Sequence, residues 1–139
     1  MPDIKKKILE ILEKHPIAAM ATITEEGKPW VRYVSLTASD DLTMRTATGL
    51  KSRKVEHIKK NPEIHMTCGY TPGKPGPYLQ IQAHATISTA AKEKKAIWND
   101  HLAEYFSGPD DLNFGVVIVK PYRIEFMDWS SKEPKVWKA

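Results

Sequence analysis

Three cations surround a hydroxyl in the segment Lys51-Ser52-Arg53-Lys54. The spacing of the apolar residues Val55 and Ile58 predicts a short helix over residues 52–60, which begins inside this segment. A helix N-terminus carries partial positive charge and unpaired backbone N–H groups, so each cation there costs roughly 0.3–1 kcal/mol unless an anion lies nearby. Because phosphates bind at helix N-termini, the segment favours a phosphate-binding site. A solvated basic turn is the alternative, since salt screens such repulsion.

Polar residues elsewhere in the chain could extend such a site. Thr46 and Thr48 place hydroxyls near the end of a predicted strand, and Gly49 permits a sharp turn or a close approach of the backbone. Arg32 shares a strand face with apolar residues, where a charge must be paired or stay near water. Its partner could be an anionic ligand or an acidic side chain at the rim of the sheet.

Several other kinds of site are not indicated by the sequence. It has neither the spacing of a P-loop nor the three-glycine dinucleotide fingerprint, so nucleotide hydrolysis and a Rossmann cofactor are not expected. The five histidines show no metal-ligand spacing, so no metal site is predicted. The pattern identifies no catalytic acid, base or nucleophile, and reactivity is therefore expected to come from a bound cofactor.

Length and composition predict one domain over residues 1–139. The hydrophobic content of 41% and the charged content of 27% are typical of a soluble globular protein. No apolar run approaches the roughly 20 residues that cross a bilayer, and the N-terminus lacks the apolar centre of a signal peptide. Cys68 is the single cysteine, which excludes an internal disulfide. Together these features predict a cytoplasmic protein that does not associate with membranes.

Hydrophobic periodicity predicts the elements that would position these residues. Helices are expected over about residues 4–15, 52–60 and 91–106. Strands are expected over residues 17–23, 30–36, 42–46, 64–68, 79–87 and 114–128, with a bend or interruption of the last strand at Pro121. Residues 70–77 are expected to form a hairpin loop, and the tail with Trp129 and Trp137 is expected to be irregular. The dominance of hairpins indicates a mainly β fold, an antiparallel barrel or a strongly curved sheet with flanking helices.

Four segments in a fixed order carry a family resemblance. They are Trp30-Val31-Arg32-Tyr33-Val34, residues 46–55 followed by Ile58 and Asn61-Pro62, residues 80–85 (Gln-Ile-Gln-Ala-His-Ala) and residues 120–126 (Lys-Pro-Tyr-Arg-Ile-Glu-Phe). With these segments the chain resembles the pyridoxamine 5'-phosphate oxidase-like flavoprotein superfamily, and within it the small general stress protein branch.

The resemblance implies an antiparallel Greek-key split β-barrel. It also implies a homodimer with FMN in a groove at the subunit interface, and the two tail tryptophans, which a monomer would have trouble burying, favour the same expectation. Residues 52–54 would hold the 5'-phosphate and residues 32–35 would line the isoalloxazine ring. The cofactor-binding residues implied in this way are Arg32, Tyr33, Val34, Ser35, Thr46, Thr48, Lys51, Ser52, Arg53, Lys54 and Gln80.

Two departures from the family pattern concern the substrate. Met127 stands where pyridoxamine phosphate oxidases carry a tryptophan after the glutamate–phenylalanine pair. The arginine-and-histidine segment that grips pyridoxal phosphate in those oxidases has no match in the short tail. Oxidation of pyridoxamine phosphate is therefore not expected.

Four functions remain open at this point. The first is an FMN-dependent oxidoreductase whose substrate and reductant are unknown. The second is an FMN carrier or sensor without turnover, and the third is the same fold with deazaflavin F420 or haem. The fourth is nucleic-acid binding by a small basic barrel through Trp30, Arg32, Tyr33 and Arg45, which the net charge of +4 would suit. The first function is favoured, and a nucleic-acid partner is not expected.

Overall fold

The structure is a computed structural model that describes residues 3–69 and 71–139. Its helices are α1 (Ile4–Lys14), α2 (Arg53–Lys60) and α3 (Ala91–Ile97), and the 3-10 helix η1 (Asp100–Glu104) follows α3. Its strands are β1 (Ile17–Ile23), β2 (Pro29–Ser35), β3 (Thr37–Ala38), β4 (Met44–Gly49), β5 (Glu63–Cys68), β6 (Tyr78–Ser88), β7 (Phe114–Met127) and β8 (Lys135–Lys138).

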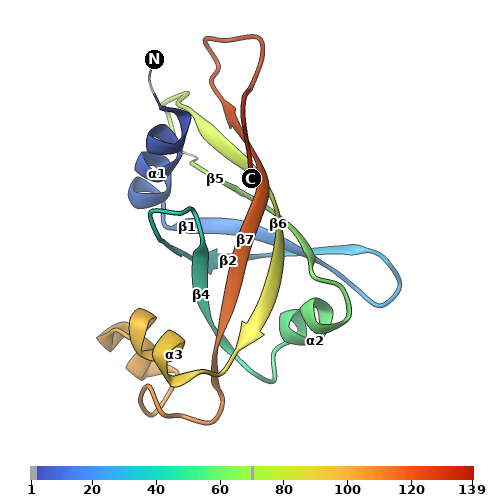
Figure 1. Ribbon diagram of the computed structural model, residues 1–139, viewed down its shortest axis with the longest axis vertical. Helices are drawn as coiled ribbons and strands as arrows, with labels where there is room; N and C mark the ends of the chain where they lie inside the picture. Colours follow the sequence, from blue (N-terminus) through green and yellow to red (C-terminus); the bar gives the residue numbers. More distant parts are fainter. Residues whose placement is uncertain (1–2, 70) are drawn as a thin grey trace.

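The strands form one strongly curved antiparallel sheet. Its order is β2-β1-β5-β6-β7-β4-β3, and β8 pairs with β7. Figure 1 shows β1 crossing β6 and β7 at a steep angle, with α2 near one end of β1 and α3 beyond the end of β4. The mainly β class with flanking helices is confirmed, and the curvature brings β2, β4 and α2 to the same side of the molecule.

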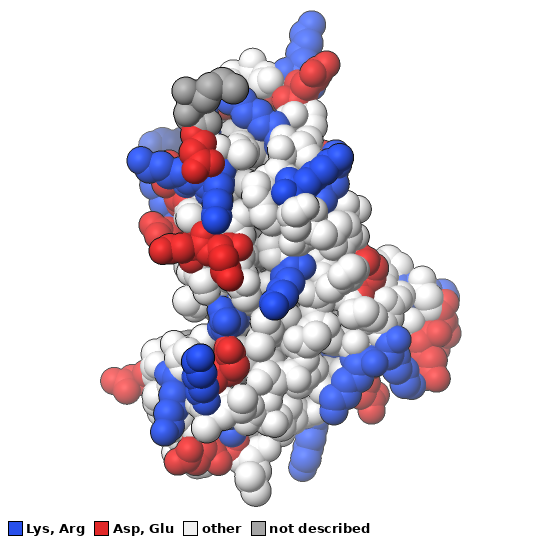
Figure 2. Space-filling model, in the orientation of Figure 1, with Lys and Arg blue, Asp and Glu red and all other residues white. Residues whose placement is uncertain are grey.

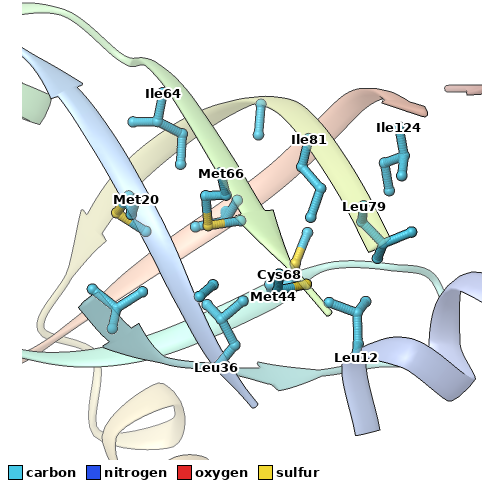
Figure 3. Close-up of a cluster of buried hydrophobic side chains, with 14 of the residues drawn as sticks. Leu12, Met20, Leu36, Met44, Ile64, Met66, Cys68, Leu79, Ile81 and Ile124 are labelled. Carbon is cyan, nitrogen blue, oxygen red and sulfur yellow. The ribbon is translucent and has the colours of Figure 1, made fainter. Parts of the chain in front are cut away.

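Alternating side chains of the strands build one interior. Along β6, Leu79, Ile81 and Ala83 are fully buried, while the polar residues between them point outward. Figure 3 shows side chains from α1 and from β1, β4, β5, β6 and β7 pointing into the same interior. Burial of each large apolar side chain contributes roughly 1.5–3 kcal/mol, so this cluster is the main source of stability.

Two predicted elements near the C-terminal half are wrong. The helix expected to reach Phe106 ends at Ile97, because Trp98 takes extended backbone (φ −62°, ψ 134°). The side chain of Asn99 then caps η1 by accepting a hydrogen bond from the N–H of Leu102 at 3.3 Å. The tail is not irregular throughout, since β8 pairs with β7 and places Trp137 opposite Ile124.

The strand expected over residues 42–46 is displaced towards the C-terminus. Leu42 has a positive φ of 70°, and the Asp41 carboxylate accepts a hydrogen bond from the N–H of Thr43 at 3.0 Å, so these residues form a turn and β4 begins at Met44. The two-residue strand β3 was not predicted, because it is too short for a periodic pattern.

The proline-rich segment behaves as predicted in its described part. Residues 71–77 contain neither helix nor strand, and β5 and β6 on either side pair antiparallel, as in a hairpin. Tyr70, which the prediction included, lies outside the described residues. None of the described helices is long and apolar enough to cross a membrane.

Candidate functional site

The segment predicted to bind a phosphate lies where β4 ends and α2 begins. Ser52 is the N-cap of α2 with extended backbone (φ −72°, ψ 155°), but its side chain makes no capping hydrogen bond to the helix. Its hydroxyl instead lies 3.0 Å from Thr48 Oγ1 and accepts a hydrogen bond from Lys54 Nζ at 3.3 Å. The first N–H groups of α2 therefore receive no acceptor from the residue that normally supplies one. We call Thr48, Ser52, Arg53, Lys54 and Arg32 the anion seat.

Arg32 reaches the seat from β2. Its side chain is half-buried, and Nη1 donates hydrogen bonds to Thr22 Oγ1 at 2.8 Å and to the carbonyl oxygen of Met20 at 3.3 Å. Within residues 3–69 and 71–139, no carboxylate lies within ion-pair distance of Arg32, Arg53 or Lys54. The alternative that Arg32 pairs with an acidic side chain at the rim of the sheet is therefore wrong.

Burial and neighbouring positive charge lower the pKa of two cations of the seat. Burial, followed by the charge of Arg53, lowers the pKa of Arg32. Burial, followed by the charge of Arg32, lowers the pKa of Lys54. The guanidinium of Arg53 lies 5.0 Å from the centroid of the Trp30 ring, which it covers. Glu56 in the first turn of α2 is exposed and forms no ion pair with Arg32, Arg53 or Lys54 among the described residues. Positive charge is thus gathered and partly desolvated without a paired carboxylate, and a bound anion would relieve this cost.

A pocket of about 550 Å³ opens beside the seat. Thr48 and Lys54 belong both to the seat and to the lining of the pocket. Of the predicted cofactor-binding residues, six line it: Tyr33, Val34, Ser35, Thr46, Thr48 and Lys54. Residues from β2, β4 and α2 that are distant in sequence thus surround one space.

The other predicted residues lie outside the lining of this pocket. Ser52 is joined to it through its contacts with Thr48 and Lys54, and Arg32 and Arg53 lie at the seat. Lys51 is exposed in the turn before α2. Gln80 lies on β6, between Thr67 of β5 and Glu125 of β7, with its side chain on the outer face of the sheet. Lys51 and Gln80 therefore belong neither to the pocket lining nor to the anion seat, and all eleven cofactor-binding assignments stay predictions.

One wall of the pocket was missed by the sequence interpretation. It comes from the last residue of α3 and the segment that follows, and is formed by Ile97, Asn99, His101, Leu102, Tyr105 and Phe106. Trp98 and Phe106 anchor this segment by packing on Phe114, with ring centroids 5.6 Å and 4.9 Å from that ring. The available signal was Asn99, a typical capping residue, which ends one helical turn and begins another.

A second, larger hollow of about 880 Å³ lies away from the seat and is mainly apolar. Tyr33, Cys68, Tyr78 and Trp129 are among its lining residues, and Tyr33 lines both hollows. Burial raises the pKa of the Cys68 thiol to about 11, so the thiol is protonated near neutral pH and is not a nucleophile. Among the described residues, no group of three His, Cys, Asp or Glu side chains could hold a metal ion.

The fourth open function, nucleic-acid binding, is weakened by Arg45. Its Nε donates to Glu93 Oε2 at 2.5 Å and its Nη1 donates to Ser39 Oγ at 2.8 Å, so its charge is already paired. Figure 2 shows acidic and basic side chains interspersed over the visible face, without a continuous basic patch.

Comparison with known proteins identifies the family. The sequence profile of the family described as pyridoxamine 5'-phosphate oxidase matches residues 4–128. The chain belongs to the pyridoxamine 5'-phosphate oxidase family. The chain is 35% identical to general stress protein 26 of Bacillus subtilis over 133 residues, which are 95% of this chain and 94% of that protein.

Solved structures confirm the split β-barrel. General stress protein 26 from Bacillus anthracis superposes with a TM-score of 0.85 at 23% identity, covering 98% of each chain. Two more distant structures carry ligand names. A pyridoxamine 5'-phosphate oxidase-related, FMN-binding protein from Nostoc punctiforme has a TM-score of 0.71 at 15% identity, covering 99% of this chain and 90% of its own. A haem-binding protein from Mycobacterium smegmatis has a TM-score of 0.79 at 13% identity, covering 99% of this chain and 59% of its own.

Proposed function

We propose that this protein binds FMN and uses the flavin as an oxidoreductase. The observation that carries the proposal is the anion seat, in which Arg32, Arg53 and Lys54 gather beside the start of α2 with no carboxylate partner among the described residues. FMN has a phosphate at one end and a planar ring at the other. The pocket of about 550 Å³ beside the seat falls within the roughly 300–1,000 Å³ that small-molecule sites occupy.

The residues of the seat fit a phosphate monoester. Such a group carries up to two negative charges and offers several acceptor oxygens, which match the cations, the Ser52 and Thr48 hydroxyls and the N–H groups of the first turn of α2. Residues 33–35 and Thr46 would then lie along the ring and the ribityl chain inside the pocket. The family membership of the chain and the FMN-binding relative with the same fold support this assignment.

These positions indicate what the cofactor and the protein would each contribute to the reaction. When bound, the flavin supplies hydride or electron transfer. The cations of the seat would hold the phosphate, β2 would orient the ring, and the wall formed by residues 97–106 would shield one side of the pocket from water.

We also propose that two copies associate through the edge strand β2 and place the pocket at their interface. β2 ends the strand order of the sheet, and it carries a group of exposed apolar side chains together with its neighbour β1. Their exposed fractions are 55% for Ile17, 47% for Trp30, 63% for Val31 and 80% for Tyr33. An exposed apolar edge strand is a surface that natural proteins cover, and Tyr33 reaches from it into the pocket.

A flavin carrier or sensor without turnover is the second candidate. The lining of the pocket supports it, because the described lining residues include no carboxylate, and His101, which could act as an acid or base, is exposed in η1. Steady-state assays of the FMN-loaded protein with NADH or NADPH and a panel of electron acceptors separate the two functions. Turnover supports the oxidoreductase, and its absence across the panel supports the carrier. The absorption spectrum of the bound ligand distinguishes FMN from F420 or haem.

The test of FMN binding is a fluorescence titration of the unliganded protein with FMN. Replacement of Arg53 and Lys54 by alanine removes two charged hydrogen-bond donors at about 1.5–3 kcal/mol each, so the Kd is expected to rise by roughly 10²- to 10⁴-fold. The matched control replaces Lys59 and Lys60, which lie in the last turn of the same helix, and has the same net charge. The proposal fails if the wild-type protein binds no FMN, or if the two double variants bind it equally well.

A further inference from the structure

A buried hydroxyl connects the two sides of the anion seat. Thr22 on β1 has no exposed surface, and its Oγ1 contacts two different elements. Arg32 Nη1 on β2 donates to it at 2.8 Å, and His57 Nδ1 on α2 lies 2.8 Å from the same oxygen. The strand that carries Arg32 and the helix that carries Arg53 and Lys54 therefore meet at one atom.

The chemistry of the three groups fixes the direction of these hydrogen bonds. An arginine can only donate, so Thr22 Oγ1 accepts from Arg32. The hydroxyl proton of Thr22 is buried and needs its own acceptor. In the part of the chain that the structure describes, His57 Nδ1 is the acceptor within reach. We therefore assign the ring proton of His57 to Nε2, so that the chain of donors runs from Arg32 through Thr22 to His57.

We infer that Thr22 and His57 are positioning residues that hold the Arg32 guanidinium in the anion seat. The inference rests on the proposed function, because it gives Arg32 the task of meeting the phosphate of FMN. Without the Thr22 hydroxyl, Arg32 keeps only the longer bond to the carbonyl oxygen of Met20 at 3.3 Å. Burial of the Arg32 guanidinium, followed by the charge of Arg53, lowers the pKa of Arg32, and both would then favour rotation of the guanidinium towards water. A side chain ordered before the ligand arrives loses less conformational entropy on binding.

The same bonds also fix where α2 lies. His57 is in the second turn of α2, and its contact with Thr22 ties the helix to β1. The cations on the first turn of α2 and the guanidinium from β2 are therefore held at a set separation. A phosphate that contacts both sides requires this separation, whereas the flavin ring does not.

The test compares FMN with riboflavin, which has the same ring and ribityl chain but no phosphate. Thr22→Val keeps the shape of the side chain and removes the hydroxyl, and His57→Phe keeps a ring and removes the acceptor. Each is expected to weaken FMN binding by roughly tenfold while the Kd for riboflavin changes by less than about twofold. Thr22→Ser and His57→Asn restore a hydroxyl and an acceptor near Nδ1, and they are expected to recover most of the FMN affinity.

The outcomes separate this inference from the proposed function. Wild-type protein that binds no FMN overturns both. Wild-type protein that binds FMN, with Thr22→Val and His57→Phe unchanged in FMN affinity, overturns the positioning role alone. Equal losses for FMN and riboflavin also overturn it, because they indicate a general structural role. His57 is only part-buried, so His57→Phe keeps the test available if Thr22→Val does not fold.

A second measurement needs no flavin. Nitrogen-15 NMR of the unliganded protein reports which ring nitrogen of His57 carries the proton. We expect an unprotonated Nδ1 in the wild type and a change in its resonance in Thr22→Val. A neutral His57 with the proton on Nδ1 would contradict the assigned direction of the chain and overturn the inference.

Discussion

Lys54→Met is expected to stabilise the unliganded protein and, at the same time, to weaken FMN binding. Lys54 is the second residue of α2, where a positive charge opposes the helix dipole at a cost of roughly 0.3–1 kcal/mol. Burial and the charge of Arg32 both lower its pKa, so the unfolded chain binds this proton more tightly than the folded protein does. The stability of the unliganded protein should therefore rise as the pH increases through the lowered pKa of Lys54.

The size of both effects follows from what the substitution removes. Methionine keeps the unbranched stem of Lys54, and the lost hydrogen bond to Ser52 Oγ is long at 3.3 Å, so it contributes little. Removal of the misplaced charge should raise Tm by roughly 1–4 °C for a chain of this length. Loss of one charged contact to a phosphate costs about 1.5–3 kcal/mol, or roughly a 10- to 150-fold higher Kd for FMN.

The assay is thermal unfolding of the unliganded protein at low salt, together with a titration with FMN. Lys59→Met is the matched control, because Lys59 lies in the last turn of α2, where a positive charge favours the dipole. It should lower Tm slightly and leave FMN binding unchanged. Added salt should shrink both shifts in Tm. The reasoning is refuted if the two variants shift Tm in the same direction, or if Lys54→Met binds FMN as tightly as the wild type.

Three further predictions concern the interface, the backbone and the buried thiol. Val31→Asp places a charge on the exposed edge strand and is expected to give a monomer in sedimentation velocity, while Leu112→Asp, at a site that is 93% exposed, should leave the dimer intact. A monomeric wild type would contradict the proposed interface. Gly69→Ala is expected to lower the free energy of unfolding in urea by about 1–3 kcal/mol, because φ is +112° and the added Cβ would lie 2.8 Å from the backbone of β6. Gly73→Ala is the control: φ is +76°, but the space around it is open, so the free energy of unfolding should fall by less. Burial raises the pKa of Cys68 to about 11, so between about pH 9 and 11 the folded protein keeps a thiol proton that the unfolded chain has lost. The free energy of unfolding of the wild type should therefore fall with pH in this range. The fall should be steeper than in Cys68→Ala by about 1 kcal/mol per pH unit. Equal slopes in denaturant unfolding would contradict this.

Local patterns predicted the parts of the site that depend on neighbouring residues. The helix at residues 53–60 was predicted from the spacing of Val55 and Ile58, which are both buried. The positive charges of Lys51, Arg53 and Lys54 at its start also predict an anion-binding site from the sequence alone. The alternation along β6 is regular because the interior covers one face of that strand.

The parts that were missed depend on contacts between distant residues. Trp98 looks like part of a continuous helical stripe, but it leaves the helix and packs on Phe114, which lies beyond the next loop. Thr22 and His57 are 35 residues apart, and no spacing rule connects a strand hydroxyl with a histidine on a later helix. The pairing of β8 with β7 is equally non-local.

Strand β2 has consequences for how the protein responds to its own abundance. Its residues 33–35 line the pocket, while Val31 and Tyr33 face solvent at the edge of the sheet. In the proposed dimer, β2 would contact both the bound FMN and the neighbouring copy. FMN binding and dimerisation would therefore be coupled, so a shift in one equilibrium would shift the other. Dilution would then loosen the flavin, and abundant flavin would drive subunits together.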